Sequence, residues 1–317
     1  MLRFVLKRCL LGLFLAFIVL TLIFLSLHLV PGDPAEIILT GEGGGAASPE
    51  ALAKVRSELG LDQSLWTQYV QYLSGIISGD LGSSFRDNSA VTAAVAERLP
   101  RTLELVAVAV LLALVVGIPL GSLAAKRGGV VDAAINLVTS TGISVPVYVI
   151  GTVFVLVFSL KLGWFPAGGY RPAEADLAGH LQRVLLPALA LSFGIISVVS
   201  RMTRSAVLEV IGQDYVRTAK AIGLSGPTVF RKHVLRGSLN PVVTVVGLQV
   251  GTLLGSTVLV ERIFNWPGLS GLLVESVLQR DYPVVQGIVI VISVIFILIN
   301  IIVDISYGML DPRVRTS

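Results

Sequence analysis

The stretch "YPVVQGIVIVISVIFILINIIV", which runs from Tyr282 to Val303, contains no Asp, Glu, Lys or Arg. A helix needs about 20 predominantly apolar residues to cross a bilayer, with roughly 17 to 25 as the usual range. The 22 residues of this stretch lie within that range. We therefore predict that it is a transmembrane helix, and this prediction decides the class of fold.

Further charge-free segments precede this one along the chain. They are Leu10–Val30, Leu105–Ala125, Ile135–Leu160, Val184–Ser200 and Ser238–Val260. Only 14% of the 317 residues are charged. A soluble domain has about 25%, and buried helices of a soluble core would need charged faces between them. The sequence predicts an all-α integral membrane protein with six transmembrane helices. The third segment is long enough to tilt or to overrun the bilayer.

Positive charges predict the orientation of these helices. With six spans, both termini lie on one side together with the 126–134 and 201–237 loops, and these four parts carry 14 Lys or Arg residues. The short 161–183 and 261–281 loops on the other side carry 5. Because short cytoplasmic loops are enriched in Lys and Arg, both termini are predicted to be cytoplasmic. The same bias accounts for the net charge of +4 without a nucleic-acid partner.

The long external connection, residues 31–104, separates the first span from the others. Ser48 followed by Pro49 predicts the start of a helix that ends before Gly60. Another helix is predicted in "DQSLWTQYVQYLSGII" (62–77), with one face against the membrane interface or the membrane core. That face contains Leu65, Tyr69 and Tyr72.

This spacing of the spans predicts a division of the chain into an accessory part and a core. The expected parts are residues 1–96, with the first span and the external segment; 97–310, a five-helix core; and 311–317, a cytoplasmic tail.

The sequence lacks the motifs of an ATPase or a zinc enzyme. No G-x-x-x-x-G-K loop and no H-E-x-x-H pair occurs, so we expect no catalytic residue and no metal site in this chain. The spans also lack ion-coupling charges, which is typical of a conduit without an energy source of its own. An intramembrane serine protease is the alternative from another class, because Ser144 stands in a G-x-S triplet. The only histidine within a span is His28, so helix packing is the preferred role for Ser144.

Other hydroxyl residues near Ser144 share this ambiguity. They are predicted to pack helices together, with the lining of a polar path as the alternative: Thr139, Ser140 and Thr141.

The most basic cytoplasmic loop contains "DYVRTAKAIGLSG", from Asp214 to Gly226. Asp214 is expected to cap a helix that begins at Tyr215, and Gly223 is expected to end it in the left-handed conformation. Tyr215, Ala219 and Ile222 share one face of this helix. A helix of about two turns is marginal alone, so something must pack against it. It is either a surface helix that stabilises the loop or a docking helix for a cytoplasmic partner.

This loop and several other stretches resemble one family of membrane proteins. They are "DYVRTAKAIGLS" with "HVLRGSLNPVVT" (233–244), "PGDP" (31–34), "VERIFNWPGLSGLLVESVLQRDYPVVQG" (260–287) and "DPRVR" (311–315). Together they are similar to permeases of binding-protein-dependent ABC transporters, in the dipeptide/oligopeptide/nickel branch. The general loop motif of these permeases is E-A-A, three residues, G, nine residues and then I-x-L-P. Of the E-A-A residues only the second alanine is matched, by Ala219; Gly223 and Leu235 also match, and Arg236 stands where the proline would be.

The resemblance implies a type I ABC importer permease fold with a cytoplasmic coupling helix, in the inner membrane of a bacterium or archaeon. It implies a related second permease subunit, two cytoplasmic ATPase subunits that bind ATP and Mg²⁺, and an external substrate-binding protein. No cofactor is expected in this chain. The cargo implied is di- or oligopeptides, with nickel, glutathione or a glycoside as alternatives.

The resemblance also implies which residues couple this chain to the ATPase. Tyr215 and Ala219 would pack against it, Arg217 and Lys220 would make polar contacts, and Gly223 would stop the helix. The full predicted set is Asp214, Tyr215, Arg217, Thr218, Ala219, Lys220 and Gly223.

Overall fold

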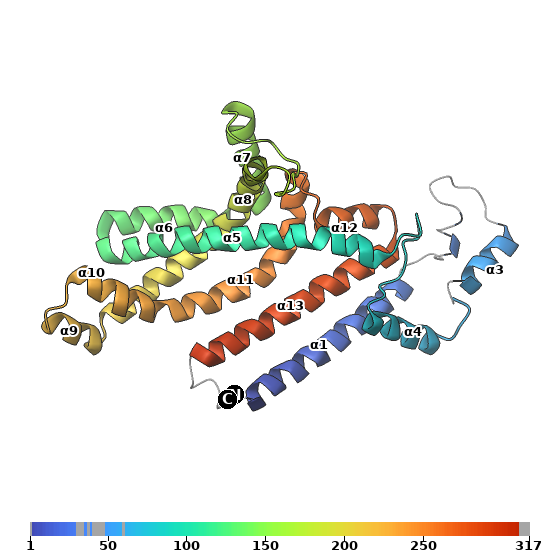
Figure 1. Ribbon diagram of the computed structural model, residues 1–317, viewed down its shortest axis with the longest axis horizontal. Coiled ribbons are helices and arrows are strands. Elements are labelled where there is room, and N and C mark those ends of the chain that lie inside the picture. The colour runs from blue at the N-terminus through green and yellow to red at the C-terminus, as the bar shows by residue number, and fades with distance from the viewer. Residues whose placement is uncertain (1, 30–34, 37–38, 40–47, 59–60, 311–317) are drawn as a thin grey trace.

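The computed structural model describes residues 2–29, 35–36, 39, 48–58 and 61–310, and these are almost entirely helical (Figure 1). The "PGDP" stretch, Gly60 and the expected tail 311–317 lie outside the described residues. The helices are α1 (Leu2–Leu29), α3 (Pro49–Glu58), α4 (Leu65–Ser78), α5 (Val91–Arg127), α6 (Gly129–Ser144), α7 (Val147–Phe154), α8 (Leu177–Ile211), α9 (Asp214–Ala221), α10 (Gly226–Val229), α11 (Arg236–Ile263), α12 (Leu269–Leu278) and α13 (Tyr282–Leu310). Two π-helical segments, Val155–Lys161 and Phe230–Leu235, extend α7 and join α10 to α11.

Five helices of the described chain are long and apolar enough to cross a membrane by themselves. Two of them lie within α1 and α13, and the others are α5, α8 and the continuous run from α10 to α11. A sixth span is present if α6 and α7, with its π-helical extension, count as one broken span. The predicted all-α membrane fold is therefore confirmed.

The third predicted span, Ile135–Leu160, is not one tilted helix. It bends by 105° between Ser144 and Val147. Val145 is extended, with φ −91° and ψ 126°, and Pro146 follows it outside both helices. A proline removes a backbone donor and pushes the preceding residue out of the helical region, so the helix stops there. The expectation of a tilted or overlong helix was wrong for this reason.

The most extensive helix contact is between α5 and α8, and two glycines on α5 let the two helices approach closely. A Cβ added at Gly117 would lie 2.8 Å from Val199, and one at Gly121 would overlap the carbonyl oxygen of Ser200. Small residues of this kind let transmembrane helices approach until their backbones touch. This crossing forms the centre of the main hydrophobic core, which also includes buried residues of α7 and α11.

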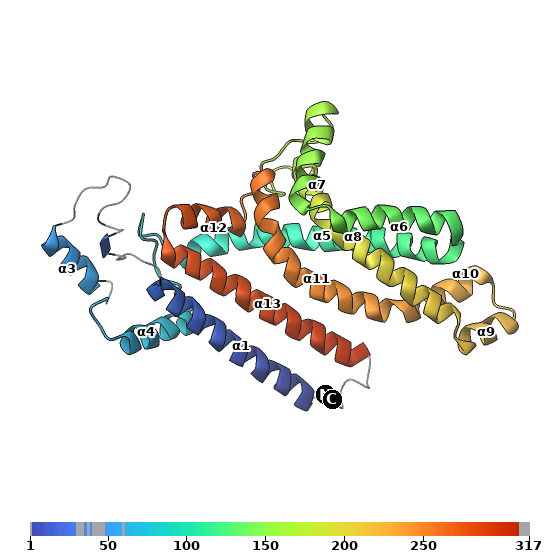
Figure 2. The same cartoon turned by 180° about the vertical axis from the view of Figure 1, so that it is seen from behind.

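The first and last spans lie side by side (Figures 1 and 2). Gly12 of α1 faces Ile301 of α13, where an added Cβ would lie 2.6 Å from the Ile301 Cδ1. An ion pair of 3.0 Å between Arg8 Nη1 and Asp304 Oδ2 joins the same two helices. The expected boundary between residues 96 and 97 falls inside the continuous helix α5, and the division into parts stays a prediction.

Figures 1 and 2 show α9 and α10 at one end of the long helices, with α12 and α4 at the other. We call these the α9 end and the α12 end. The beginning of α1 and the end of α13 lie toward the α9 end (Figure 1).

Candidate functional site

The α9 helix ends in the backbone arrangement that its glycine predicts. Gly223 has φ +86°, in the left-handed region. The Gly223 amide donates to the Lys220 carbonyl at 3.0 Å, and the Leu224 amide donates to the Ala219 carbonyl at 3.3 Å. This pair of bonds is the Schellman motif, which satisfies carbonyl groups at the end of a helix. The prediction that Gly223 stops the helix is confirmed.

The beginning of α9 differs by one residue from the prediction. Asp214 is the first helical residue, and Gln213 precedes the helix without a side-chain hydrogen bond to it. The Asp214 carboxylate is instead 3.5 Å from the Arg217 guanidinium, and both side chains are exposed. The Asp214 carbonyl accepts a hydrogen bond of 3.1 Å from the Thr218 hydroxyl. Asp214 is therefore not the predicted cap.

The inward face of α9 is also shifted from the predicted one. Ala219, at 5% exposed, and Val216, which is fully buried, point into a small hydrophobic cluster of the same chain. We call this cluster the loop core; its buried members are Val207, Val216, Ala219, Val229 and Val234. Ala219 is covered by its own chain, so its expected packing on a partner surface is not available in this structure.

The outward face of α9 is a mixed polar and apolar surface. Ile222 is 71% exposed, and Tyr215 and Leu224 are also exposed. Arg217 and Lys220 stand exposed beside them. Among the predicted residues, Ala219 alone is buried, and the structure leaves the others open at the surface: Asp214, Tyr215, Arg217, Thr218, Lys220 and Gly223. Sequence reasoning placed Ile222 on the apolar face but did not include it, or Leu224, in the predicted set.

The loop core ties α9 to the ends of the long helices. Phe230 packs on the loop core, and the Lys126 ammonium at the end of α5 lies 3.3 Å from the centre of its ring. A bidentate pair between Arg204 of α8 and Asp132 of α6, with both contacts at 2.5 Å, lies toward the same end. Cation–π contacts and bidentate pairs both hold defined geometries. The loop core therefore connects α9 to α5, to α8 and to the segment that leads into α11.

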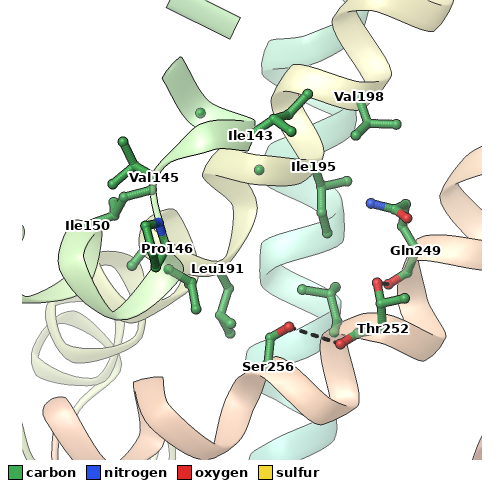
Figure 3. A pocket seen from close by; sticks show the side chains of 15 residues that line it. Ile143, Val145, Pro146, Ile150, Leu191, Ile195, Val198, Gln249, Thr252 and Ser256 are labelled. Carbon is green, nitrogen blue, oxygen red and sulfur yellow. Dashed lines mark hydrogen bonds between the residues drawn. The ribbon is translucent and has the colours of Figure 1, made fainter. Parts of the chain in front are cut away.

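A cavity of about 330 Å³ lies between the break of α6 and α7, helix α8 and helix α11 (Figure 3). Its polar side chains, Gln249, Thr252 and Ser256, all come from α11 and lie along one side. The opposite side is apolar and includes Pro146 and Leu191. No charged side chain lines this cavity.

The hydroxyl residues predicted near this region do not line the cavity; Gly142 and Ile143, beside them, do. Thr139 is buried and bonds to the carbonyl of Asn136, as expected for a packing residue. The Ser144 hydroxyl donates to the Ser140 carbonyl at 3.0 Å, which is a bond inside the helix. The side chain of His28, the histidine considered for the protease alternative, lies outside the described residues.

A buried carboxylate at the α12 end was missed in the sequence. Glu261 of α11 is 1% exposed. Its Oε1 accepts from the Thr102 hydroxyl at 2.7 Å, and its Oε2 accepts from the Ser270 amide at 2.9 Å. The Leu269 amide donates to the Thr102 oxygen at 2.9 Å. Two of the free amides at the start of α12 are thereby satisfied, one by a carboxylate, which also suits the helix dipole.

The packing around Glu261 explains a glycine in the "VERIFNWPGLSG" stretch. A Cβ added at Gly268 would overlap the Glu261 carboxylate. The Trp266 indole donates to the Arg101 carbonyl at 3.0 Å, which fixes the turn between α11 and α12. A lone acid at the end of an apolar run, a few residues before a glycine and a new helix, is the signal that sequence analysis had available.

These features define a class of protein: a helical membrane protein with a short helix held at one end of its spans and an uncharged cavity among them. The family described as "Binding-protein-dependent transport system inner membrane component" matches residues 117–316. The N-terminal component of the same kind of transport system matches residues 1–106. The chain therefore belongs to the family of binding-protein-dependent transport system inner membrane components.

Two relatives match along almost the whole length of the chain. The dipeptide transport system permease protein DppB of Escherichia coli strain K12 is 40% identical over 341 aligned positions, which cover 99% of each protein. The glutathione transport system permease protein GsiC of Salmonella choleraesuis is 42% identical over 317 positions, again covering 99% of each.

Solved structures confirm the fold expected from the resemblance. A chain of the MetNI methionine ABC transporter, in an inward-facing conformation, aligns with a TM-score of 0.56 at 17% identity. The alignment covers 68% of this chain and 96% of that chain. Identity this low shows the fold alone, which this chain shares with that ABC transporter chain.

Proposed function

We propose that this chain is a permease subunit of an ATP-driven importer and that its cargo is di- or oligopeptides delivered by an external binding protein. The observation that supports the proposal is the sequence identity of 40% to a dipeptide permease and of 42% to a glutathione permease, each over 99% of the chain. Dipeptides and glutathione share amide-linked amino acids. No separate observation favours nickel or a glycoside.

The cavity beside the broken third span suits such a cargo. Gln249, Thr252 and Ser256 present uncharged hydrogen-bonding groups. Uncharged groups bind backbone amides of many peptides and do not select one charged side chain. The apolar opposite wall accommodates side chains without specific bonds. A site of this kind is expected to pass many peptide sequences, with selection made by the binding protein.

We propose the partners that the family's mode of action requires. They are a related second permease subunit, two ATPase subunits that bind ATP and Mg²⁺, and the external binding protein. The exposed face of α9 is the proposed contact with an ATPase, because an apolar Ile222 beside Arg217 and Lys220 suits a groove on a soluble partner. This chain supplies no hydrolytic activity in the proposal.

We also propose that the protein lies in the inner membrane of a bacterium or archaeon, with both termini and the α9 end in the cytoplasm. The excess of Lys and Arg in the loops at that end supports this orientation. Single cysteines at Ser225 and Gln63 test it in intact cells. An impermeant thiol reagent added outside should label the second position only; labelling at Ser225 overturns the orientation.

Uptake measurements test the cargo. The chain is expressed with the other subunits of its own transport system in cells that lack peptide importers, and uptake of a labelled dipeptide, glutathione and nickel is compared. We expect dipeptide uptake that depends on this chain. Uptake of nickel alone, or of no peptide, contradicts the proposal.

A matched pair of variants tests the cavity. Thr252 lines it and bonds to the Gln249 carbonyl at 2.8 Å, whereas Thr244, on the same helix, lies outside it and bonds to the Asn240 carbonyl at 3.2 Å. We expect a several-fold rise in the concentration for half-maximal uptake with Thr252→Val and little change with Thr244→Val. Equal effects of the two substitutions on uptake would contradict a role for the cavity in transport.

A further inference from the structure

The α4 helix, Leu65–Ser78, contains no charged residue and carries two adjacent apolar stripes. Residues three or four apart lie on one face of a helix. One stripe is Leu65, Tyr69, Tyr72 and Ile76, and the other is Trp66, Val70, Leu73 and Ile77. The remaining face is uncharged but polar, with Thr67, Gln68, Gln71, Ser74 and Ser78.

Tyr69 and Tyr72 of the first stripe pack against α1. The Tyr69 and Thr21 hydroxyls are 2.6 Å apart. The Phe24 ring lies 5.1 Å from that of Tyr69 and 5.4 Å from that of Tyr72, measured between ring centres. These contacts fix α4 against the first span along one side.

The second stripe is open at the surface of the chain. Trp66 is 72% exposed, Val70 48% and Ile77 87%. The neighbouring surface of α1 is also apolar and open, since Leu22 and Leu25 are exposed. Leu22 and Leu25 each follow in sequence a residue that contacts α4, so exposed apolar side chains of both helices lie close to this contact.

The position along α1 at which α4 makes contact places α4 beside the apolar part of α1 and not beyond its end. Thr21 is eight residues before the end of α1 at Leu29, which is about 12 Å along the helix axis. A contact with the last span gives a similar depth for this part of α1. The side-chain amide of Gln286, one turn into α13, donates to the Ile23 carbonyl at 3.2 Å. One turn is about 5.4 Å. Helices in a membrane interface bury their apolar face about 5 to 10 Å into the boundary of headgroups and acyl chains.

We infer that α4 is an interfacial helix that lies in the leaflet at the α12 end, with Trp66, Val70 and Ile77 against acyl chains. Tryptophan and tyrosine are enriched at this depth of membrane proteins. Because α4 has no Lys or Arg, its hold on the bilayer rests on apolar area alone and requires no anionic lipid.

The consequence is a fixed connection between the membrane and the corner of α12 and α13. The chain leaves α4 and turns at Ser84 and Phe85, where the Ser84 hydroxyl and the Phe85 amide donate to the Asp281 carboxylate at 2.6 and 3.1 Å. Asp281 immediately precedes α13. The segment from α4 to Phe85 thus joins the lipid interface to the start of the last span.

Spin labels test the placement of α4 in the full-length chain. Cys9 is replaced by serine, and single cysteines are introduced at Val70, Ile77 and Gln71 and labelled with a nitroxide. Leu22 serves as the lipid-facing control and Gln63 as the exposed control outside the helix. The protein is reconstituted in phosphatidylcholine without anionic lipid, and collisions with oxygen and with a water-soluble nickel chelate are compared.

We expect labels at Val70 and Ile77 to collide mainly with oxygen, as at Leu22, and the label at Gln71 mainly with nickel, as at Gln63. Nickel collisions at Val70 and Ile77 would place the stripe in water and overturn the inference. Protection of both positions from both reagents would show a protein partner on the stripe and would also overturn it.

A second measurement uses Trp66, the native tryptophan of the open stripe, and needs no spin label. Brominated phosphatidylcholine quenches tryptophans that touch acyl chains, and the chain has only 3 tryptophans. The quenched fraction should fall in Trp66→Phe relative to the unmodified chain. An unchanged quenched fraction contradicts contact of Trp66 with lipid.

Discussion

Replacement of Gly223 tests whether the end of α9 sets its orientation. The native residue has φ +86°, and a Cβ there would meet no atom within 4 Å. Gly223→Val therefore introduces no clash with neighbours, and its whole effect comes from the backbone. A side chain in the left-handed region costs roughly 1 to 2 kcal/mol, and β-branching makes valine one of the worst choices.

This cost is similar to what holds α9 in place. Burial of a valine side chain such as that of Val216 contributes about 1.5 to 3 kcal/mol. Loss of the left-handed turn also releases the hydrogen bonds at Gly223 and Leu224, each with a net contribution of about 0.5 to 1.5 kcal/mol. A change of one or two kcal/mol alters a conformational ratio by about 5- to 30-fold. We expect Gly223→Val to weaken capture of the ATPase and peptide uptake by a factor in this range, with normal membrane insertion.

Two control variants separate this effect from general damage to the loop. Asparagine tolerates the left-handed conformation better than other side chains, so Gly223→Asn should retain most of the activity. Gly212, at the other end of α9, has an ordinary φ of −76°, so Gly212→Ala should be near normal. The assays are pull-down of the ATPase from solubilised membranes and uptake in cells. If Gly223→Val inserts, captures the ATPase and imports as well as both controls, the role assigned to the end of α9 is refuted.

Three further substitutions lead to predictions of the same kind. Ile222→Asp changes an exposed residue and should abolish ATPase capture with no loss of thermal stability, whereas Ala219→Glu places a carboxylate in the loop core and should lower the melting temperature of the detergent-solubilised protein. Normal ATPase capture by Ile222→Asp contradicts the proposed contact, and an unchanged melting temperature for Ala219→Glu contradicts the loop core. Glu261→Leu leaves the Ser270 amide and the Thr102 hydroxyl without an acceptor and should destabilise the protein by about 1 to 3 kcal/mol per unsatisfied group, measured by denaturant or thermal unfolding in detergent. A stability equal to that of the unmodified chain would show that the α12 amides find other acceptors.

The features that could be predicted from the sequence are those determined by neighbouring residues. Long charge-free runs are transmembrane helices because charges and unpaired backbone groups are costly in lipid, which holds whatever the other helices do. Gly223 ends α9 because its own backbone adopts a conformation that side chains disfavour. Pro49 begins α3 because its missing amide needs no partner in a first turn. Pro146 carried an equally local signal, and the break in the third span was overlooked.

Other features were decided only when the helices packed together. The sequence pattern of α9 allows Tyr215, Ala219 and Ile222 to form its inner face. In the structure Val216 and Ala219 are buried in the loop core instead, because they pack against α8 and the start of the fifth span. Glu261 is acceptable inside the protein only because Thr102, distant in sequence, donates to it. The cavity exists only where the broken third span, α8 and α11 meet. Each of these depends on contacts between distant segments, and the energy of such contacts is absent from any single stretch of sequence.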